Sequence, residues 1–300
     1  MSRKQLKENK VTEMLEYGTH NQPMGTWSDD SSMVLATIDS LIQNKRIDYN
    51  DIMNKFLDWY SKGEYTPTGK VFDIGNATVS ALMKYKNNKT TFLCGSKDIN
   101  SNGNGSLMRI LPISLYLHYT YDSIFEVVNN ISSMTHAHIY SVFSCIIYSV
   151  LINEYLKEFD IKKAYYNMQL VIKKILDDKD NKILDNLDDI KCRFDRIIYK
   201  DISILQESDI KSTGFVIDSL EASIWCILNT NNYEEAVLKA VNLGDDTDTI
   251  GAITGGLAGL IYGYDNIKPG WISSLKRNNY LTNMVDKFIK LINEAKVQVR

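Results

Sequence analysis

The chain has 300 residues, of which 44% are hydrophobic and 24% charged, the composition of one large or two small globular domains. Its net charge of −3 and its lack of a basic block argue against nucleic-acid binding. Four scattered cysteines without C-x-x-C spacing, and an N-terminus without an apolar segment, predict a cytoplasmic protein with reduced thiols.

The first informative segment is residues 25–31 (GTWSDDS), in which Ser28, Asp29 and Asp30 precede apolar residues at helical spacing. Such a segment often caps a helix, because its side-chain oxygens accept hydrogen bonds from free amide groups. A cap needs one acceptor, whereas this segment supplies several. Ligand sets made only of oxygen suit hard cations such as Mg²⁺ or Mn²⁺.

Two turns follow in the chain. Asp73 and Asn76 flank a glycine at the entry to a helix expected near residue 77, where they either cap the helix or take part in chemistry. Further on, residues 102–106 (NGNGS) form a glycine-rich turn before another helix. Glycines let backbone amides approach an anion, so Asn104, Gly105 and Ser106 form a candidate pyrophosphate site.

The middle of the chain combines a histidine pair with two long helical segments. His136 could contact a phosphate, a hydroxyl group or a metal, although a histidine near a helix start is more often structural, and no third zinc ligand follows at a useful spacing. Residues 139–155 are apolar almost all round, which predicts a core helix. Residues 157–212 are rich in Lys and Asp, notably at 177–182, and predict a solvated helical insertion with an exposed loop.

The second acidic segment, residues 244–249 (GDDTDT), again precedes a helix. If the fold brings both acidic segments together, up to five carboxylates share a small volume, and their repulsion requires a cation. The following helix carries four glycines at four-residue spacing, which predicts close packing of one face against another helix: Gly251, Gly255, Gly259 and Gly263. It is too short and glycine-rich to indicate a membrane span.

In this order the segments resemble the ADP-ribosylglycohydrolase family, most closely its dinitrogenase-reductase-activating branch. The resemblance rests on residues 25–33, 72–76, 104–109, 135–136, 214–222 and 243–263. It departs from the family pattern at three places. The family usually opens with an apolar helix carrying a Gly-Asp-Ala-Leu-Gly-like segment, which the polar residues 1–10 do not replace. Ser28 stands where Thr is usual, and Phe215 where Tyr is common.

The resemblance implies an all-α fold, a single domain over residues 1–300, arranged as an orthogonal helical bundle with a two-metal site in a central cleft. Two Mg²⁺ or Mn²⁺ ions would bind the ribose diol and position a water for attack at C1″. Their implied ligands are Ser28, Asp29, Asp30, Asp246, Asp248 and Thr249. The implied catalytic carboxylates are Asp73, Asp29 and Asp246. Asn76 would lie near the scissile bond, Asn104, Gly105 and Ser106 at the pyrophosphate, and His136 near the phosphate or distal ribose.

The implied activity is metal-dependent hydrolysis of the N-glycosidic bond between ADP-ribose and a modified side chain, with arginine expected as the acceptor. The substrate would be an ADP-ribosylated protein or small molecule. The expected enzyme is a cytoplasmic monomer with no membrane or nucleic-acid partner. Two alternatives remain at this stage: a two-metal phosphoesterase, and an ADP-ribose-binding protein with impaired catalysis.

Overall fold

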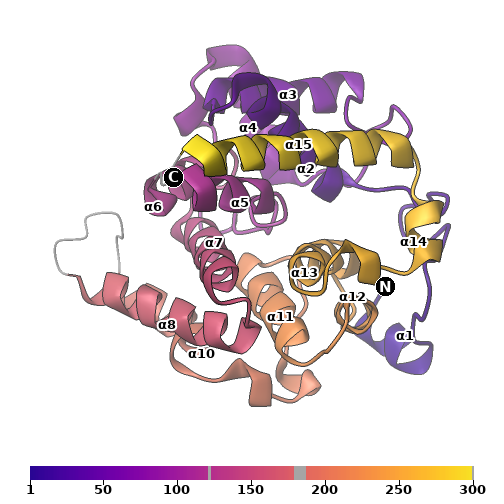
Figure 1. Cartoon of the computed structure of the whole chain (residues 1–300), viewed down its shortest axis with the longest axis vertical. Coiled ribbons are helices and arrows are strands. Elements are labelled where there is room, and N and C mark those ends of the chain that lie inside the picture. The colour runs from indigo at the N-terminus through magenta and orange to yellow at the C-terminus, as the bar shows by residue number, and fades with distance from the viewer. Residues whose placement is uncertain (121–122, 179–186, 299–300) are drawn as a thin grey trace.

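A computed structural model describes residues 1–120, 123–178 and 187–298. Within these residues the fold is all-helical, as expected, with no strand (Figure 1). The α-helices are α1 (Arg3–Glu8), α2 (Asp29–Asn44), α3 (Tyr49–Lys62), α4 (Asn76–Asn88), α5 (Leu111–Thr120), α6 (Ile124–Ser133), α7 (Ile139–Glu158), α8 (Ile161–Asp177), α9 (Leu187–Arg193), α10 (Asp195–Tyr199), α11 (Val216–Leu228), α12 (Tyr233–Asn242), α13 (Thr247–Tyr262), α14 (Pro269–Ser274) and α15 (Asn278–Gln298). Short 3₁₀ turns occur at η1 (Thr91–Leu93), η2 (Ile202–Ile204), η3 (Glu207–Asp209) and η4 (Tyr264–Asn266).

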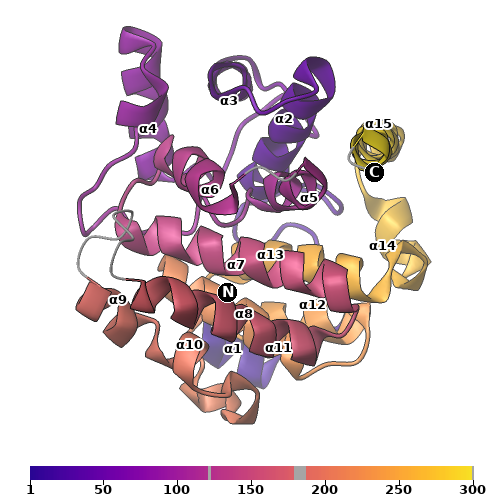
Figure 2. The ribbon, with the colours of Figure 1, turned by 60° about the vertical axis from the view of Figure 1, so that its left-hand side comes forward.

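Helix α7 forms the centre of the molecule and packs against α5, α6, α8 and α11 (Figure 2). It is long and apolar enough to span a membrane, yet 83% of its apolar stretch is buried inside the protein. Apolar residues all round suit a helix that has neighbours on every side. The expected core helix over residues 139–155 is therefore confirmed.

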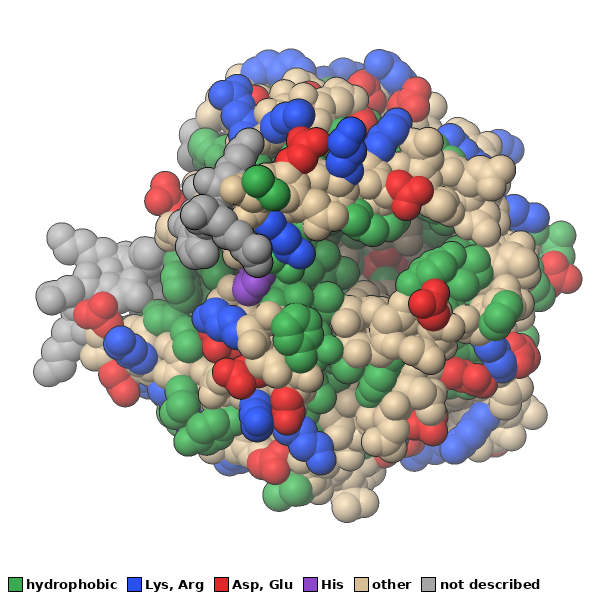
Figure 3. All heavy atoms as spheres, viewed as in Figure 1, with side chains coloured by type: hydrophobic (Ala, Val, Ile, Leu, Met, Phe, Trp, Pro, Cys, Tyr) green, Lys and Arg blue, Asp and Glu red, His purple; other side chains and the backbone are tan. Residues whose placement is uncertain are grey.

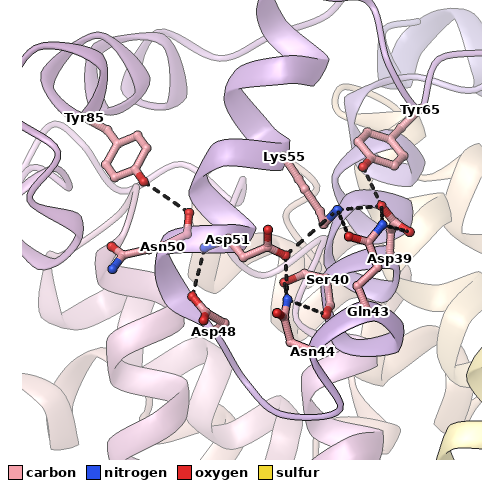
Figure 4. A network of polar contacts seen from close by, with 10 residues as sticks. All are labelled: Asp39, Ser40, Gln43, Asn44, Asp48, Asn50, Asp51, Lys55, Tyr65 and Tyr85. Carbon is pink, nitrogen blue, oxygen red and sulfur yellow. Dashed lines mark hydrogen bonds and ion pairs between the residues drawn. The ribbon is translucent and has the colours of Figure 1, made fainter.

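A polar network ties α2 to α3 (Figure 4). The ammonium group of Lys55, largely buried on α3, lies 2.7 Å from Asp39 Oδ2 and donates to Gln43 Oε1 at 3.1 Å, both on α2. The Tyr65 hydroxyl donates to the same Asp39 oxygen at 2.8 Å. A buried cation that contacts both a carboxylate and an amide oxygen is well compensated. The network thereby holds α2, whose first turn carries the first acidic segment, against α3. Helix α15 lies along α2 and α5 (Figure 1).

Within the expected helical segment 157–212, the described residues form helices α8, α9 and α10 as far as Tyr199, whereas residues 200–212 form loops and the two short 3₁₀ turns η2 and η3. Helix α8 runs alongside α7 (Figure 2), and its inner face, including Met168 and Ile172, is fully buried. Solvent therefore reaches only the outer face of this helix. Of the charged loop 177–182, residues 179–182 lie outside the described residues.

The glycines of α13 face α12, as expected, but they leave more room than the sequence analysis predicted. A methyl group on Gly255 would lie 3.4 Å from the Tyr233 hydroxyl and 3.6 Å from Val237 Cγ2, at the edge of ordinary van der Waals contact. Gly251 and Gly259 face the same helix at similar distances. Gly263 does not belong to this face, because it follows the last turn with a φ of +86°.

Candidate active site

The two acidic segments converge in the structure, although more than two hundred residues separate them in sequence. Asp29 and Asp30 form the first turn of α2, Asp246 is the N-cap of α13, and Asp248 and Thr249 lie in the first turn of α13. Helices α2 and α13 pack against each other. Each helix directs its positive end toward the cluster, which favours carboxylates there.

Local backbone contacts position each acidic turn. Gly25 has a φ of +74°, and a methyl group on it would lie 1.8 Å from the Ser274 carbonyl oxygen, so only glycine fits. The amide of Lys276 donates to the Gly25 carbonyl at 3.0 Å. The chain that leaves α14 therefore clamps the turn that leads into Ser28 and α2.

The N-terminal residues hold the second acidic turn. Arg3 donates from Nε to the Leu243 carbonyl at 2.9 Å and from its guanidinium to Ser212 Oγ at 3.0 Å. The amide of Asp245 donates to the Met1 carbonyl at 2.8 Å. Residues Arg3–Glu8 form helix α1, which the sequence analysis did not anticipate, because only Leu6 marks an apolar face.

Asp73 joins the cluster from the loop before α4. Its φ is +59°, a left-handed conformation that aspartate tolerates better than most residues. It forms a hydrogen bond with Asp248. Five carboxylates thus gather from three parts of the chain: Asp29, Asp30, Asp73, Asp246 and Asp248. The two acidic segments alone predicted a set of five that included Asp245, which is instead exposed.

His20 also belongs to this site, and the sequence analysis missed it. Its Nε2 lies 3.1 Å from Asp73 Oδ2 and 3.9 Å from Asp248 Oδ2, and its ring centroid lies 5.7 Å from that of Phe72. His20 stands in a loop without helical periodicity, eight residues before Ser28, so no spacing rule connects it with the carboxylates. Its nearness to the first acidic segment was the one available signal.

Crowding perturbs the acidity of the cluster. Burial, with the charges of Asp30 and Asp73, raises the pKa of Asp29 to about 9. Burial and the charge of Asp248 raise the pKa of Asp30 to about 7. Asp73 is raised to about 8 by burial and by its hydrogen bond with Asp248, and Asp246 to about 6 chiefly by burial. Against the effect of its own burial, hydrogen bonds with Asp73 and Asp246 lower the pKa of Asp248.

These carboxyl groups fit a divalent cation. Asp30 is 3% exposed, its Oδ2 accepts a hydrogen bond from Ser28 Oγ at 2.7 Å, and its Oδ1 has no hydrogen-bond partner. A buried carboxylate oxygen without a partner costs free energy unless a ligand satisfies it. Hard cations bind such oxygens and remove the repulsion among the carboxylates.

Asn104 connects the glycine turn with the acidic cluster. Its side-chain amide donates to Asp246 Oδ2 at 2.6 Å and to Ser219 Oγ at 2.9 Å. Both protons of this amide are therefore committed within the protein, and Asn104 orients Asp246. The Ser106 hydroxyl is fully buried and accepts a hydrogen bond from Ser132 Oγ at 2.9 Å, so its side chain faces the core.

His136 lies directly beneath the glycine turn. A methyl group on Gly105 would lie 2.8 Å from His136 Cε1, so the turn requires glycine there. Buried Arg109 donates to Thr135 Oγ1 at 2.7 Å, and Thr135 Oγ1 lies 2.9 Å from His136 Nδ1. Because that hydroxyl accepts from Arg109, its own proton is directed to Nδ1, which favours a neutral imidazole with its proton on Nε2. Burial, reinforced by the charge of Arg109, lowers the pKa of His136 to about 3.

A cavity of about 510 Å³ opens beside the acidic cluster and is lined by His20, Ser28, Asp30 and Asp248. Apolar side chains, among them Met14 and Trp271, form part of its wall.

Asn76 is exposed at the first position of α4, and no contact of its side chain connects it with the carboxylates. On the face drawn in Figure 3, a hollow below α15 is bordered mainly by hydrophobic side chains and holds an acidic side chain.

The model of the family described as ADP-ribosylglycohydrolase matches residues 1–298. The chain belongs to the ADP-ribosylglycohydrolase family. Members of this family are glycosyl hydrolases, so the resemblance and the enzyme class expected from the sequence are confirmed.

Relatives include the ADP-ribosylarginine hydrolase Tri1 of Serratia proteamaculans, 30% identical over 286 residues, which cover 95% of this chain and 72% of that protein. The ADP-ribosyl-[dinitrogen reductase] glycohydrolase of Rhodospirillum rubrum is 25% identical over 287 residues, covering 92% of this chain and 86% of the relative. A solved structure titled ADP-ribosylglycohydrolase-related protein complex superposes with a TM-score of 0.74 at 24% identity, covering 94% and 88% of the two chains. It supports the family's all-helical fold.

Proposed function

We propose that this enzyme hydrolyses the N-glycosidic bond between ADP-ribose and an arginine side chain, with two divalent cations held by the acidic cluster. The observation that carries this proposal is the convergence of the first turns of α2 and α13, which gathers carboxylates around a partnerless buried oxygen of Asp30. Relatives named ADP-ribosylarginine hydrolase support arginine as the acceptor.

The cation ligands in this proposal are Ser28, Asp29, Asp30, Asp246, Asp248 and Thr249. Bound Mg²⁺ or Mn²⁺ would supply Lewis acidity that orients the ribose diol and lowers the pKa of a nearby water. Asn104 keeps Asp246 in place through its 2.6 Å hydrogen bond. The pairing between Ser28 and Asp30 leaves Asp30 Oδ1 free to face a cation.

Asp73 is the proposed general base. During the reaction, the oxygen of water bonds to C1″ while Asp73 accepts a proton from that water. The bond from C1″ to the guanidino nitrogen breaks, and its electron pair goes to the nitrogen. That nitrogen takes up the proton held by Asp73, so arginine leaves as a guanidinium and Asp73 is ionised again. In the metal-free protein, burial and the hydrogen bond with Asp248 raise the pKa of Asp73 to about 8. A bound cation would lower this pKa, because its charge favours the ionised carboxylate, which is the form that accepts a proton. Asp29 and Asp246 share the cluster and are the alternative proton acceptors.

The glycine turn and the start of α4 form the proposed pyrophosphate site. Gly105 lies against Thr78 in the first turn of α4, a helix without a side-chain cap whose positive end attracts anions. Beneath the turn, no carboxylate of the described chain pairs with Arg109, so its charge adds positive potential there. Asn76 at the same helix start and His136 Nε2 are the proposed donors to the substrate, and Ser106 contributes through its backbone.

Four free cysteines, three of them buried, support the proposal that the enzyme works in the reducing cytoplasm. Its proposed substrates are ADP-ribosylated proteins or small ADP-ribosylated molecules. We also propose that the active form is a monomer without membrane or nucleic-acid partners; the slightly acidic net charge supports the absence of a nucleic-acid partner.

The test is incubation with ADP-ribosyl-arginine and ADP-ribosyl-serine substrates, with Mg²⁺, with Mn²⁺ or with a chelator, while the products are separated by chromatography. We expect free ADP-ribose from the arginine substrate only when a cation is present. Release of AMP or phosphate would instead identify a phosphoesterase. Tight ADP-ribose binding without turnover would identify a binding protein.

A further inference from the structure

His20 brings an imidazole nitrogen, which can act as a metal ligand, to a cluster of oxygen donors, and nothing in the proposed reaction uses it. Its Nε2 points at two carboxylates, 3.1 Å from Asp73 Oδ2 and 3.9 Å from Asp248 Oδ2. These three atoms all lie within 4.8 Å of one another. The three side chains are between 31% and 38% exposed, so an ion can reach them from solvent.

The spacing of these atoms matches a cation coordination shell. In a six-coordinate shell with metal–oxygen bonds of about 2.1 Å, neighbouring ligand atoms lie about 3 Å apart and opposite ones about 4.2 Å apart. The 3.9 Å between Nε2 and Asp248 Oδ2 falls within these limits, and Asp73, the proposed proton acceptor, is not counted as a ligand. A small movement of the side chains therefore suffices to complete the shell.

Asp30 supplies an independent sign that an ion belongs here. Its side chain is buried, its Oδ1 lacks a partner, and among its neighbouring charges Asp248 acts on it most strongly. Asp248 is thus shared between the buried oxygen of Asp30 and the imidazole of His20. A cation bound to Asp248 would lie between the buried Oδ1 of Asp30 and the partly exposed Nε2 of His20.

We propose that His20 is a direct nitrogen ligand of one cation in this cluster, and that it biases the site toward Mn²⁺ over Mg²⁺. This inference rests on the proposed function, which requires that the acidic cluster binds divalent cations. Oxygen ligands serve both ions, whereas imidazole binds transition metals far better than it binds Mg²⁺. The contact of the His20 ring with Phe72 orients the imidazole toward the carboxylates.

Electron spin-echo spectroscopy of the Mn²⁺-loaded enzyme tests the bond directly, because a coordinated imidazole nitrogen modulates the echo. We expect this nitrogen modulation in the native enzyme and its loss in His20→Gln. The matched control is His118→Gln on α5, where His118 pairs with Asn153 instead; this variant keeps the modulation. His20 is partly exposed and lies outside the helices, so its replacement leaves the fold intact.

Calorimetry supplies the second measurement. His20→Gln should weaken Mn²⁺ binding about tenfold or more, as is common when a nitrogen ligand is lost, and change Mg²⁺ binding much less. Native enzyme that binds Mn²⁺ and releases ADP-ribose without nitrogen modulation would overturn the His20 inference and leave the proposed function standing. Modulation that persists in His20→Gln would overturn it as well. Failure to bind either ion would defeat both proposals.

Discussion

At the scale of single residues, the site combines groups whose surroundings give them different tasks. Asp30 is buried with one oxygen unpartnered, which suits a cation ligand. Asp73 is about a third exposed, so water can reach its carboxyl group, which suits proton transfer. Asn104 has both amide protons committed, and its task is to position Asp246.

Replacement of Asp73 by Asn tests its proton-accepting role. Asparagine tolerates the left-handed backbone at this position and keeps one oxygen there, so the fold and most of the cation affinity should survive. Loss of a general base typically lowers turnover by about 100-fold or more. We expect kcat for ADP-ribosyl-arginine to fall by that amount, with a smaller change in Mn²⁺ affinity measured by calorimetry. Full activity in Asp73→Asn would reduce the residue to a structural turn.

The residues that the sequence predicted best are those in compact motifs. Asp30 and Asp248 could be predicted as members of one site because each lies in an acidic segment at the start of a periodic helix. The two segments converge in the structure because the two helix starts meet. His20 and Arg3 could not be identified, because they lie in segments without periodicity and act through contacts that only the tertiary structure creates. The burial of the Ser106 side chain could not be predicted either, because the sequence of a glycine turn does not show which of its side chains face the core.

At the scale of elements, the turn that enters α13 is more constrained than the helix itself. Gly244 has a φ of +89°, and a methyl group there would lie 2.5 Å from both the nitrogen and Cα of Arg3. The glycines within α13 have ordinary distances to α12. The sequence predicted that glycine would be required along the helix, whereas in the structure glycine is required at the acidic turn that precedes the helix.

Gly244→Ala should therefore destabilise the protein by about 1–3 kcal/mol from the backbone conformation alone. The displaced turn should also weaken Mn²⁺ binding, because Asp246 follows two residues later. Urea unfolding and calorimetry measure the two effects. If both the stability and the Mn²⁺ affinity stayed unchanged, α1 would have shifted to make room for the methyl group without displacing the turn.

Gly255→Ala is the matched control for that substitution. It adds the same methyl group to a helical position with room for it, and alanine is favoured over glycine in a helix by about 1 kcal/mol. We expect equal or greater stability and unchanged cation affinity. The close packing that the four-residue spacing of the glycines predicted would instead make the added methyl group destabilising.

At the scale of the whole molecule, the clustered carboxylates link folding stability to pH and cations. The folded-state pKa values of Asp29, Asp30, Asp73 and Asp246 are raised to between about 6 and 9 by burial and by their neighbours. The folded protein therefore holds protons that the unfolded chain has released, and this contribution to stability is lost as pH rises. The lowered pKa of Asp248 acts in the opposite direction, but only in the acidic range below its ordinary pKa.

In the presence of a chelator, the melting temperature should fall between about pH 5 and about pH 8, as the raised groups ionise against one another. Mn²⁺ should restore it most at the higher pH, where the cation replaces the lost protons. Calorimetric melting at several pH values checks both statements. An Asp29→Asn variant should show a shallower pH dependence. A melting temperature that rises with pH in the chelator would contradict the proposed crowding.

The Met1 carbonyl and the first turns of α2 and α13 lie close together in the folded protein. The order in which the ribosome synthesises these segments therefore determines when the site can form. While the ribosome is still synthesising α12, Asp29 and Asp30 have already left the exit tunnel, but the segment that completes their cluster does not yet exist. The nascent chain must hold these carboxylates in water until α13 emerges. In the proposed function, cation capture would therefore be a late event of biosynthesis, because a polypeptide interrupted before α13 lacks Asp246, Asp248 and Thr249.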